Sequence, residues 1–146
     1  MKLEGKVALV TAAGRGIGKG IALALAREGA RLVVNSFAAD TTAATVAEIA
    51  AQGVDVVSLV GDITDPNKIL EMRNLALDSF GQIDILVNNV GAGPKSAIEP
   101  EDHELGMAAA LWDALYAQNV KPLVLMSEAV IPHMRERQTG KSIHIS

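Results

Sequence analysis

The chain has 146 residues, of which 49% are hydrophobic and 3% aromatic, and it has a net charge of −4 and no cysteine. The length suits one domain with a core of Ala, Val, Leu and Ile, while disulfides, thiolate metal sites and a basic nucleic-acid surface are excluded. No segment has the roughly 20 apolar residues of a membrane helix and the N-terminus lacks a signal-peptide pattern, so the sequence predicts a cytoplasmic protein that does not bind membranes.

The first half of the chain alternates between strand-like and helix-like segments. The predicted strands lie at residues 6–11, 31–35 and 55–60, and the predicted helices lie at residues 17–28 and 41–52. Asp40 stands where it can cap the second of these helices. The apolar spacing predicts the buried face of each helix, namely Ile17, Ile21 and Leu25 in the first and Val46, Ile49 and Ala50 in the second.

The segment Thr64-Asp65-Pro66 opens the third predicted helix. A proline early in a helix costs no hydrogen bond, because the first N–H groups of a helix have no partner within it. The predicted buried face of this helix consists of Ile69, Met72, Leu75 and Ala76. Residues 83–88 then form a fourth predicted strand.

The second half begins with a loop rich in Gly and Pro at residues 91–100, followed by a long helix over about residues 102–134. Pro122 is expected to kink this helix, because proline has no N–H to donate to the preceding turn. Gly140 ends the helix, and residues 141–146 form a fifth strand. This alternation predicts an α/β fold, a Rossmann-type, doubly wound parallel sheet of about five strands with helices on both faces.

Residues 7–18, VALVTAAGRGIG, combine an apolar run with a turn that contains Gly14, Gly16 and Gly18, and a helix-like pattern follows at once. Glycines let the backbone approach a pyrophosphate, and the N-terminus of a helix offers unpaired N–H groups and the positive end of a dipole. The order of strand, glycine turn and helix therefore predicts a phosphate site. No repeat or linker divides the chain, so residues 1–146 are expected to form a single dinucleotide-binding domain.

Four further segments place polar side chains near predicted strand or helix ends, namely Asp62, Asn88-Asn89-Val90-Gly91, Asn119 and the C-terminal run GKSIHIS. Each has a structural interpretation when it is taken alone. Asp62 can cap the helix that begins near residue 65, the two asparagines can end a strand in a turn, and Asn119 can lie on a helix surface. Their order and spacing, together with the glycine turn, favour a functional interpretation.

Together these segments resemble the short-chain dehydrogenase/reductase family over all 146 residues. The family's turn motif, Thr-Gly-x-x-x-Gly-x-Gly, falls on residues 11–18, where Ala12 replaces the first Gly and is expected to crowd the turn slightly. The resemblance implies hydride transfer between a nicotinamide cofactor and a small alcohol or ketone. The residues that it implies for cofactor binding are Thr11, Ala12, Gly14, Arg15, Gly16, Ile17, Gly18, Ser36, Asp62, Ile63, Asn89, Val90 and Gly91.

The resemblance also assigns roles to two polar residues. Asp62 is similar to the family Asp that hydrogen-bonds the adenine, and Asn119 is similar to the Asn that helps hold a proton-relay water, which makes it the one catalytic residue implied here. An acid at the end of the second strand would bind a ribose 2′-OH and repel a 2′-phosphate, but Ser36 stands there. Arg15 can pair with a 2′-phosphate, so NADP(H) is favoured over NAD(H).

The family's proton donor is a Tyr followed four residues later by a Lys, and a Ser orients the substrate. The one tyrosine here, Tyr116, is followed four residues later by Val120, and Ser146 matches the Ser before the reactive one. We therefore expect a truncated form that is inactive alone. Its fifth strand would be an exposed edge, which predicts marginal stability or self-association.

Two other functions fit parts of the pattern. The chain could be a non-catalytic dinucleotide-binding or interaction module that a partner completes. The glycine turn also fits an adenosylmethionine-dependent methyltransferase, but Ser36 and the Asn88–Gly91 segment argue against that cofactor. The three histidines, His103, His133 and His144, stand apart in the sequence, so no metal site is predicted.

Overall fold

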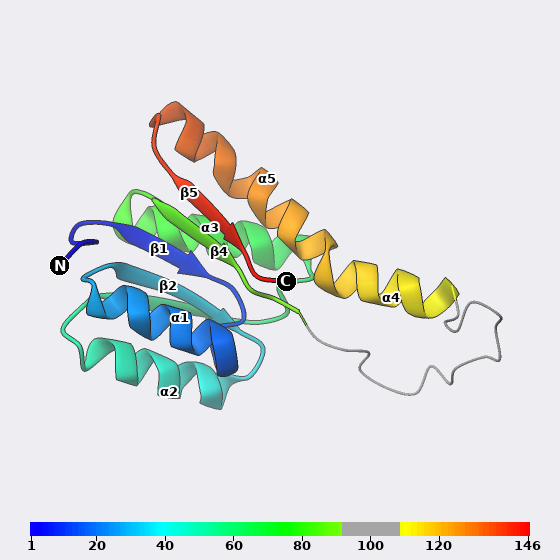
Figure 1. The fold of residues 1–146 in the computed structure, drawn as a ribbon, viewed down its shortest axis with the longest axis horizontal. Coiled ribbons are helices and arrows are strands. Elements are labelled where there is room, and N and C mark those ends of the chain that lie inside the picture. The colour runs from blue at the N-terminus through cyan, green and yellow to red at the C-terminus, as the bar shows by residue number, and fades with distance from the viewer. Residues whose placement is uncertain (92–108) are drawn as a thin grey trace.

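The computed structural model describes residues 1–91 and 109–146, which form one parallel sheet with helices on both faces (Figure 1). The elements are β1 (Val7–Val10), α1 (Gly16–Arg27), β2 (Arg31–Ser36), α2 (Ala39–Ala50), β3 (Val56–Val60), α3 (Pro66–Phe80), β4 (Ile85–Asn88), α4 (Ala109–Asn119), α5 (Lys121–Glu136) and β5 (Lys141–His144). The strand order is β3-β2-β1-β4-β5. The predicted fold class is confirmed, although most of the predicted loop and the first turns of the long helix lie outside the described residues.

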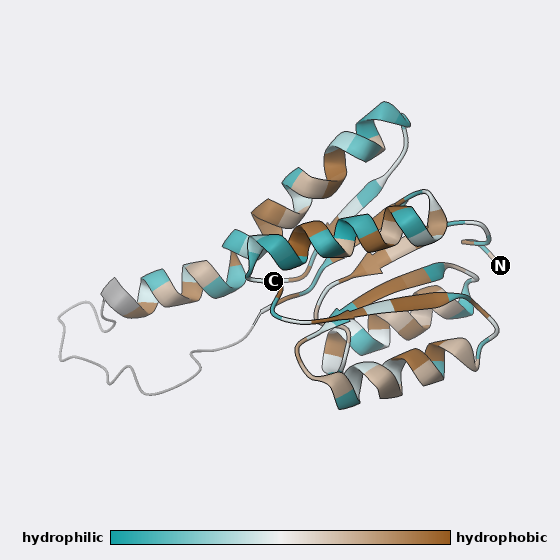
Figure 2. Cartoon of the chain, turned by 180° about the vertical axis from the view of Figure 1, so that it is seen from behind, coloured by the Kyte–Doolittle hydropathy of each residue, from teal (hydrophilic) through white to brown (hydrophobic). Residues whose placement is uncertain are grey.

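Alternate strand residues enter two apolar cores, one on each face of the sheet, as the period of two in a strand requires. One core joins strand residues to α3 and α5, and it includes Val7, Leu9, Val33, Leu86, Met72, Met126 and Val130. The other joins them to α1 and α2, and it includes Ala8, Val10, Leu32, Val34, Val87, Ala22, Ala26 and Ile49. Figure 2 shows the hydrophobic strands between these helix layers.

The register of the sheet brings three strand ends to one edge. Val10 at the end of β1 lies opposite Val34 in β2 and Val87 in β4. Helix α1, which follows β1, packs on one face of the sheet and α5 packs on the other, so a crevice opens between β1 and β4, where the direction of winding reverses. In open α/β sheets, ligands bind at this kind of switch point.

The buried face of α1 differs from the prediction. Gly18, Ala22 and Ala26 are buried, whereas Ile17 is 67% exposed. Ile21 and Leu25 are only partly buried at the side of the core. A glycine and two alanines let the helix axis approach the sheet closely, so the bulky residues that the spacing favoured lie one position away from the contact.

The start and inner face of α2 were also predicted wrongly in part. Ala38, not Asp40, is the N-cap, because the helix begins two residues earlier, and Asp40 accepts a hydrogen bond from the N–H of Thr41 instead. Ile49 is buried and Val46 partly buried as predicted, but Ala50 is exposed. The other buried residues of this helix are two threonines, Thr42 and Thr45, and an apolar pattern does not reveal those.

The prediction for α3 is confirmed. The Asp65 side chain accepts a hydrogen bond of 2.8 Å from the N–H of Asn67, and Pro66 is the first helical residue. The side chains of Ile69, Met72 and Ala76 are buried, and Leu75 packs against the same core. The local signals at this helix agree with its tertiary contacts, so the sequence alone was sufficient.

The predicted long helix is interrupted at Val120, between α4 and α5. Pro122 is one of the first residues of α5, and its missing N–H explains why the chain does not continue as one helix. Helix α5 packs on the sheet through the buried residues Met126, Val130 and Met134. In contrast, α4 projects away from the body of the molecule, as Figure 1 shows.

The amino edge of the sheet is held together by Asp84, whose side chain is 4% exposed. Its carboxylate accepts hydrogen bonds from the N–H of Val7 at 2.9 Å, from Gln82 at 2.6 Å and from Arg137 at 3.1 Å. Burial raises the pKa of Asp84, but the hydrogen bonds from Val7, Arg137 and Gln82 and the charge of Arg137 outweigh it. The pKa therefore lies below its usual value, and the ionised carboxylate joins β1 and β4 to the end of α5.

We predict that Asp84 makes the fold sensitive to acid. Because its pKa is lowered in the folded state, its contribution to stability is present above about pH 4, the ordinary pKa of Asp, and is lost as the pH falls further. The Asp84→Asn variant should lose about 1–3 kcal/mol of unfolding free energy at pH 7 and should respond less to acid. Urea unfolding across pH 3–7 measures both effects, with the exposed Asp78→Asn as the control. Equal acid sensitivity of wild type and Asp84→Asn would contradict the assignment.

Candidate functional site

A cavity of about 800 Å³ lies at the carboxyl edge of the sheet, where the crevice opens. Its lining includes most of the predicted cofactor residues together with the predicted catalytic Asn119, and these are Ala12, Arg15, Gly16, Ile17, Ser36, Asp62, Ile63, Asn89, Val90, Gly91 and Asn119. The other three predicted residues, Thr11, Gly14 and Gly18, are buried behind this lining. The structure thus brings the predicted residues together around one space.

Thr11 joins the end of β1 to the end of β4. Its side-chain oxygen accepts hydrogen bonds from the N–H groups of Asn89 at 2.9 Å and Val90 at 3.2 Å, and its hydroxyl donates to the carbonyl of Val87. The residue is 1% exposed. A buried hydroxyl with its donor and its acceptor capacity both in use fixes the chain positions on both sides of the crevice.

The Asn89 side chain holds the glycine turn from the other side. Its amide nitrogen donates to the carbonyls of Thr11 and Ala12, at 3.3 Å each. A Cβ on Gly18 would overlap this amide nitrogen and the carbonyl oxygen of Ala12, so a glycine is required there. The requirement for glycine at position 18 therefore has a specific physical cause, which is close packing of the first turn of α1 on Asn89.

Ala12 adopts a left-handed backbone with φ +51°, which few residues other than glycine favour. The methyl group was expected to crowd the turn slightly. The structure shows instead that the departure from the family's first Gly strains the backbone itself. The turn retains this conformation because the carbonyl of Ala12 and the N–H of the next residue are both hydrogen-bonded, the former to Asn89 and the latter to Asn35 at 2.7 Å.

The N-terminus of α1 faces the cavity without a protein cap. Arg15 is the N-cap residue and makes no side-chain cap hydrogen bond, and the first turn contains no acidic residue. Unpaired N–H groups and the positive dipole end of a helix favour an anion at this position. The donors present therefore fit a pyrophosphate group, and no carboxylate of this turn opposes it.

Asn35 supports the turn in a way that the sequence analysis missed. Its side-chain amide donates to the carbonyls of Leu59 and Gly61, at 3.1 Å each, and so ties β2 to the end of β3. Its own carbonyl accepts from the N–H of Ala13 in the glycine turn. An Asn directly after the buried apolar run Leu32–Val34 was the one available signal, because a buried amide needs hydrogen-bond partners.

Ser36 ends β2 at the cavity, where the sequence analysis placed it. Its hydroxyl lies 3.5 Å from that of Thr41, and a Cβ on Gly14 would overlap it. The close approach of Gly14 to Ser36 brings the turn against the end of β2. A side chain at residue 14 would displace Ser36, so this packing depends on glycine at position 14.

Asp62 forms a local turn rather than a helix cap. Its carboxylate accepts hydrogen bonds from the N–H and the hydroxyl of Thr64, at 2.9 and 2.7 Å. The cap of α3 is Asp65, three residues later. The cap interpretation of Asp62 is therefore wrong, and the turn directs this residue to the cavity beside Ile63.

Asn119 ends α4 at the helix break and lies across the cavity from the glycine turn. Its amide nitrogen donates to the carbonyl of Leu115 at 2.9 Å. A Cβ on Gly91 would come within 3.1 Å of the Asn119 amide oxygen, so the two residues are close neighbours. The interruption before Pro122 thus positions a side chain that a continuous surface helix would not.

Other predicted residues have structural roles or lie elsewhere. The Asn88 amide donates to Ser127 in α5 and contacts His144 in β5, and it is not part of the cavity lining. Tyr116 is 58% exposed on α4 and also lies outside the lining. Within residues 1–91 and 109–146 there is no group of three or more His, Asp or Glu that could hold a metal ion. The same part of the chain contains no helix long and apolar enough to cross a membrane.

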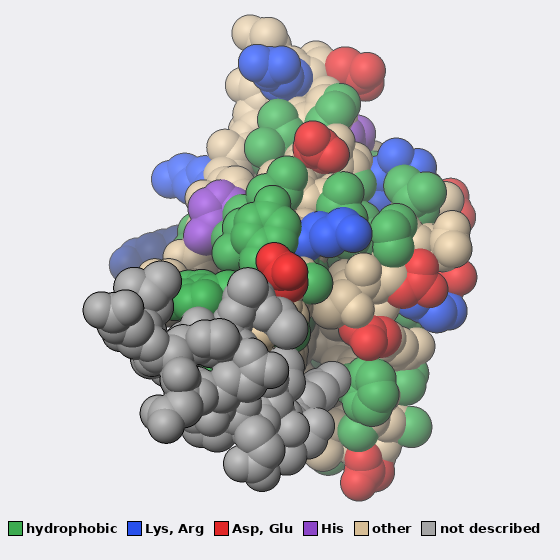
Figure 3. Space-filling model, turned by 90° about the vertical axis from the view of Figure 1, so that its right-hand side faces the viewer, with side chains coloured by type: hydrophobic (Ala, Val, Ile, Leu, Met, Phe, Trp, Pro, Cys, Tyr) green, Lys and Arg blue, Asp and Glu red, His purple; other side chains and the backbone are tan. Residues whose placement is uncertain are grey.

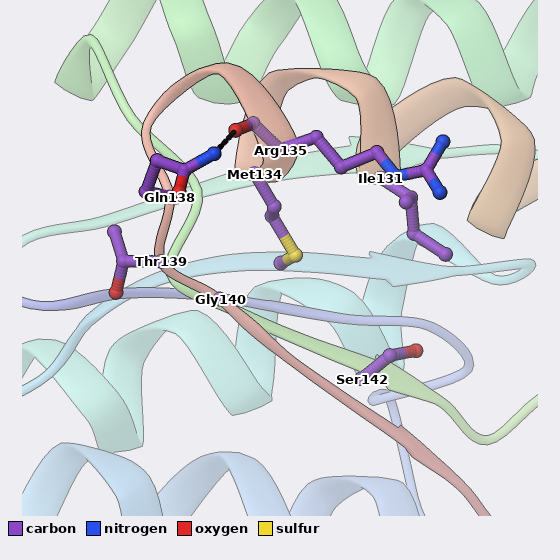
Figure 4. Close-up of a pocket in the computed structure, with 7 residues that line it drawn as sticks. All are labelled: Ile131, Met134, Arg135, Gln138, Thr139, Gly140 and Ser142. Carbon is purple, nitrogen blue, oxygen red and sulfur yellow. Dashed lines mark hydrogen bonds between the residues drawn. The ribbon is translucent and has the colours of Figure 1, made fainter.

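A second, more open hollow of about 440 Å³ lies between the end of α5 and the start of β5 (Figure 4). It is lined by Ile131, Met134, Arg135, Gln138, Thr139, Gly140 and Ser142. Lys141, at the start of β5, hydrogen-bonds the carbonyl of Asp84, so this hollow belongs to the amino edge of the sheet. It is separate from the glycine turn and from the predicted cofactor residues, although Gly140 and Ser142 belong to the C-terminal run GKSIHIS.

The surface charges do not form a single basic area in the part of the chain that Figure 3 draws in colour. Lys and Arg side chains lie scattered among Asp and Glu over this face. Charged side chains elsewhere pair locally, as Lys19 does with Glu48 and Lys68 with Glu71. Among the described residues that line the cavity, Arg15 is the one basic side chain, and the N-terminus of α1 adds the positive end of a helix dipole.

The sequence matches the family model described as short chain dehydrogenase over residues 6–146. The chain belongs to the short-chain dehydrogenase family. Among curated relatives, it is 36% identical over 146 residues to (2S)-[(R)-hydroxy(phenyl)methyl]succinyl-CoA dehydrogenase subunit BbsD of Thauera aromatica, covering 100% of this chain and 56% of the relative. It is 38% identical to D-beta-hydroxybutyrate dehydrogenase of Cupriavidus necator, covering 99% of this chain and 54% of that protein.

Solved structures of the family have the same arrangement of elements. A metagenomic short-chain oxidoreductase in complex with NADP superposes with a TM-score of 0.87 at 36% identity, covering 100% of this chain and 64% of that one. A 7α-hydroxysteroid dehydrogenase with NADH and 7-oxo glycochenodeoxycholic acid also gives 0.87, at 33% identity, covering 99% of this chain and 54% of that one. The chain spans about half the length of the curated relatives it matches.

We predict that Ala12→Gly stabilises the fold. Relief of the left-handed strain is worth about 1–2 kcal/mol, and the greater freedom of glycine in the unfolded chain offsets about 0.4–1 kcal/mol of it. The net gain should be about 0.5–1 kcal/mol in unfolding free energy, measured by urea denaturation. Ala13→Gly, at a buried neighbour whose φ is not positive, is the control and should destabilise. An Ala12→Gly variant no more stable than wild type would show that the turn is not strained at this residue.

Proposed function

We propose that the chain is the dinucleotide-binding part of an oxidoreductase that transfers hydride between a nicotinamide cofactor and a small alcohol or ketone. The observation that carries the proposal is the uncapped N-terminus of α1, which faces a cavity at the switch point of the sheet. The complexes of similar proteins with NADP and with NADH support it. When bound, the nicotinamide ring supplies or accepts the hydride.

The chain's residues divide the cavity into three parts. The first turn of α1 would hold the pyrophosphate, since it offers N–H donors and the positive end of the helix dipole. Ser36, Asp62 and Ile63 lie at the ends of β2 and β3, on the side where the adenosine half of a dinucleotide binds in such sheets. Gly91 and Asn119 lie on the opposite side and would border the nicotinamide half.

The cofactor we propose is NADP(H) in preference to NAD(H). Ser36 replaces the acid that would bind a ribose 2′-OH. The residue that packs on Gly14 at the ribose position therefore carries no carboxylate. Arg15 lines the cavity and is exposed, so its guanidinium can reach a 2′-phosphate with a charge-assisted hydrogen bond. The missing carboxylate at residue 36 and the charge of Arg15 both favour binding of the 2′-phosphate.

The 146 residues lack a proton donor at the reaction site in this proposal. Tyr116, the one tyrosine, is exposed on α4 and has no Lys four residues later. Asn119 can position a water beside the nicotinamide half, but an amide does not titrate and cannot serve as the acid. We therefore propose that these residues bind the cofactor without turnover, either as part of a reductase or as a module completed by a partner.

The binding proposal predicts a titration result. The purified chain should bind NADPH more tightly than NADH in isothermal titration, and it should not oxidise NADPH in the presence of ketones. Arg15→Ala should weaken NADPH binding about tenfold and leave NADH binding within about twofold, as expected for the loss of a charge-assisted pair. Arg27→Ala, at the far end of α1, is the matched control. Preference for NADH, an equal loss for both cofactors, or ketone reduction would each contradict one part of the proposal.

We also propose that the chain self-associates through β5. All four residues of this edge strand are exposed, and Ile143 is 44% exposed. An unprotected strand edge with an apolar side chain pairs readily with another strand. Exposed Trp112 and Tyr116 on α4 add further apolar surface, at 61% and 58% exposure.

Light scattering coupled to size-exclusion chromatography tests this association. Wild type should elute as a dimer or larger species at micromolar concentration, and Ile143→Lys should shift it toward the monomer, because a charge on an edge strand opposes pairing. Leu70→Lys, on an exposed position of α3, should not change the mass. A monomeric wild type would contradict the proposed self-association. An equal effect of both variants would show that β5 does not form the contact between the chains.

A further inference from the structure

Phe37 is the residue that directly follows β2, and it lines the large cavity. It is 69% exposed, and Ile17, which also lines the cavity, is 67% exposed. Apart from Met1, these are the two most exposed of the large apolar side chains in the described part of the chain. Exposure of two such side chains at one cavity indicates a surface that a ligand covers.

The position of Phe37 assigns it to one half of a dinucleotide. Ser36, its neighbour, lies at the ribose position at the end of β2, and Gly14 packs directly on Ser36. Gly61, Asp62 and Ile63 line the same side of the cavity from the end of β3. A base attached to a ribose at Ser36 must therefore lie between the chain after β2 and the chain after β3.

The two walls of that space differ in chemistry. Ile63 is only 3% exposed, so it offers little more than the floor of the space. Asp62 offers a carboxylate that already accepts two hydrogen bonds from Thr64. Phe37 is the one aromatic side chain among the described cavity residues, and an aromatic face stacks on a planar base whatever the base's hydrogen-bonding pattern.

We propose that the Phe37 ring stacks on the adenine of the bound dinucleotide, which makes it a binding residue for the base. The inference rests on the proposed dinucleotide function and assigns different parts of the dinucleotide to Phe37 and Arg15. Phe37 contributes affinity for adenine in NADP(H) and NAD(H) alike, whereas Arg15 acts on the 2′-phosphate alone. Loss of the ring should weaken both cofactors by the same factor and should leave the choice between them unchanged.

The experiment compares Phe37→Ala and Phe37→Tyr with wild type by isothermal titration with NADPH, NADH and adenosine 2′,5′-bisphosphate. Phe37→Ala should weaken all three about tenfold, the range expected for one base-stacking contact, and Phe37→Tyr should bind within about twofold of wild type. Millimolar nicotinamide mononucleotide, which has no adenine, should raise the thermal midpoint of wild type and Phe37→Ala equally. Leu70→Ala, at an apolar residue of α3 that is 44% exposed and lies outside the cavity lining, is the control and should change nothing.

The possible outcomes separate the two proposals. Wild-type binding with Phe37→Ala unchanged overturns the role of Phe37 and leaves the dinucleotide function standing. A loss confined to NADPH and the bisphosphate overturns it too, because the side chain would then act on the 2′-phosphate. A loss of nicotinamide mononucleotide binding would show a general change of the cavity instead of stacking. Absence of binding by wild type refutes the dinucleotide function itself. Because the side chain is 69% exposed, Phe37→Ala should melt like wild type without ligand.

Discussion

The hydrogen bonds that Thr11 makes with the end of β4 are the constraint on which the site depends. The N–H groups of Asn89 and Val90 both reach the Thr11 oxygen, and the Asn89 amide returns to the carbonyls of Thr11 and Ala12. These bonds fix the width of the crevice between β1 and β4. They also hold the strained backbone of Ala12 and the close approach of Gly18. If they were lost, the first turn of α1 would no longer point its N–H groups at a defined place in the cavity.

The two edges of the sheet are fastened by different chemistry. At the amino edge, the buried Asp84 carboxylate pairs with the cations Arg137 and Lys6 and accepts hydrogen bonds from neutral donors. At the carboxyl edge, hydrogen bonds from the uncharged side chains of Thr11, Asn35 and Asn89 join the strand ends. Neutral side chains there leave the positive potential of the α1 N-terminus and of Arg15 uncompensated by a carboxylate in the turn. A site for a pyrophosphate needs that arrangement, because a buried carboxylate in the turn would oppose the ligand.

The sequence predicted what local signals encode and missed what distant partners decide. The strands follow from their apolar runs, α3 from Asp65 and Pro66, and the turn between β1 and α1 from its glycines. The contact face of α1 could not be read from the apolar spacing, because close packing on the sheet selects Ala22 and Ala26 over the larger Ile17. The role of Asn35 depends on carbonyls more than twenty residues away, and no local pattern contains them. The left-handed φ of Ala12 is likewise held by distant residues, namely Asn35 in β2 and Asn89 directly after β4.

The helix break shows how one residue without a hydrogen-bond donor organises the opposite wall of the cavity. Pro122 cannot continue the pattern of α4, so the chain turns at Val120 and α5 returns to the sheet through Met126 and Val130. Asn119 is left at the end of α4, close to Gly91, where any side chain at residue 91 would press on its amide. A glycine at residue 91 avoids a tight contact with the Asn119 amide, and a glycine at residue 18 is required for Asn89 to reach the turn. On both walls a glycine leaves room for an asparagine from a distant element, and that pairing connects the glycine positions to the polar groups of the site.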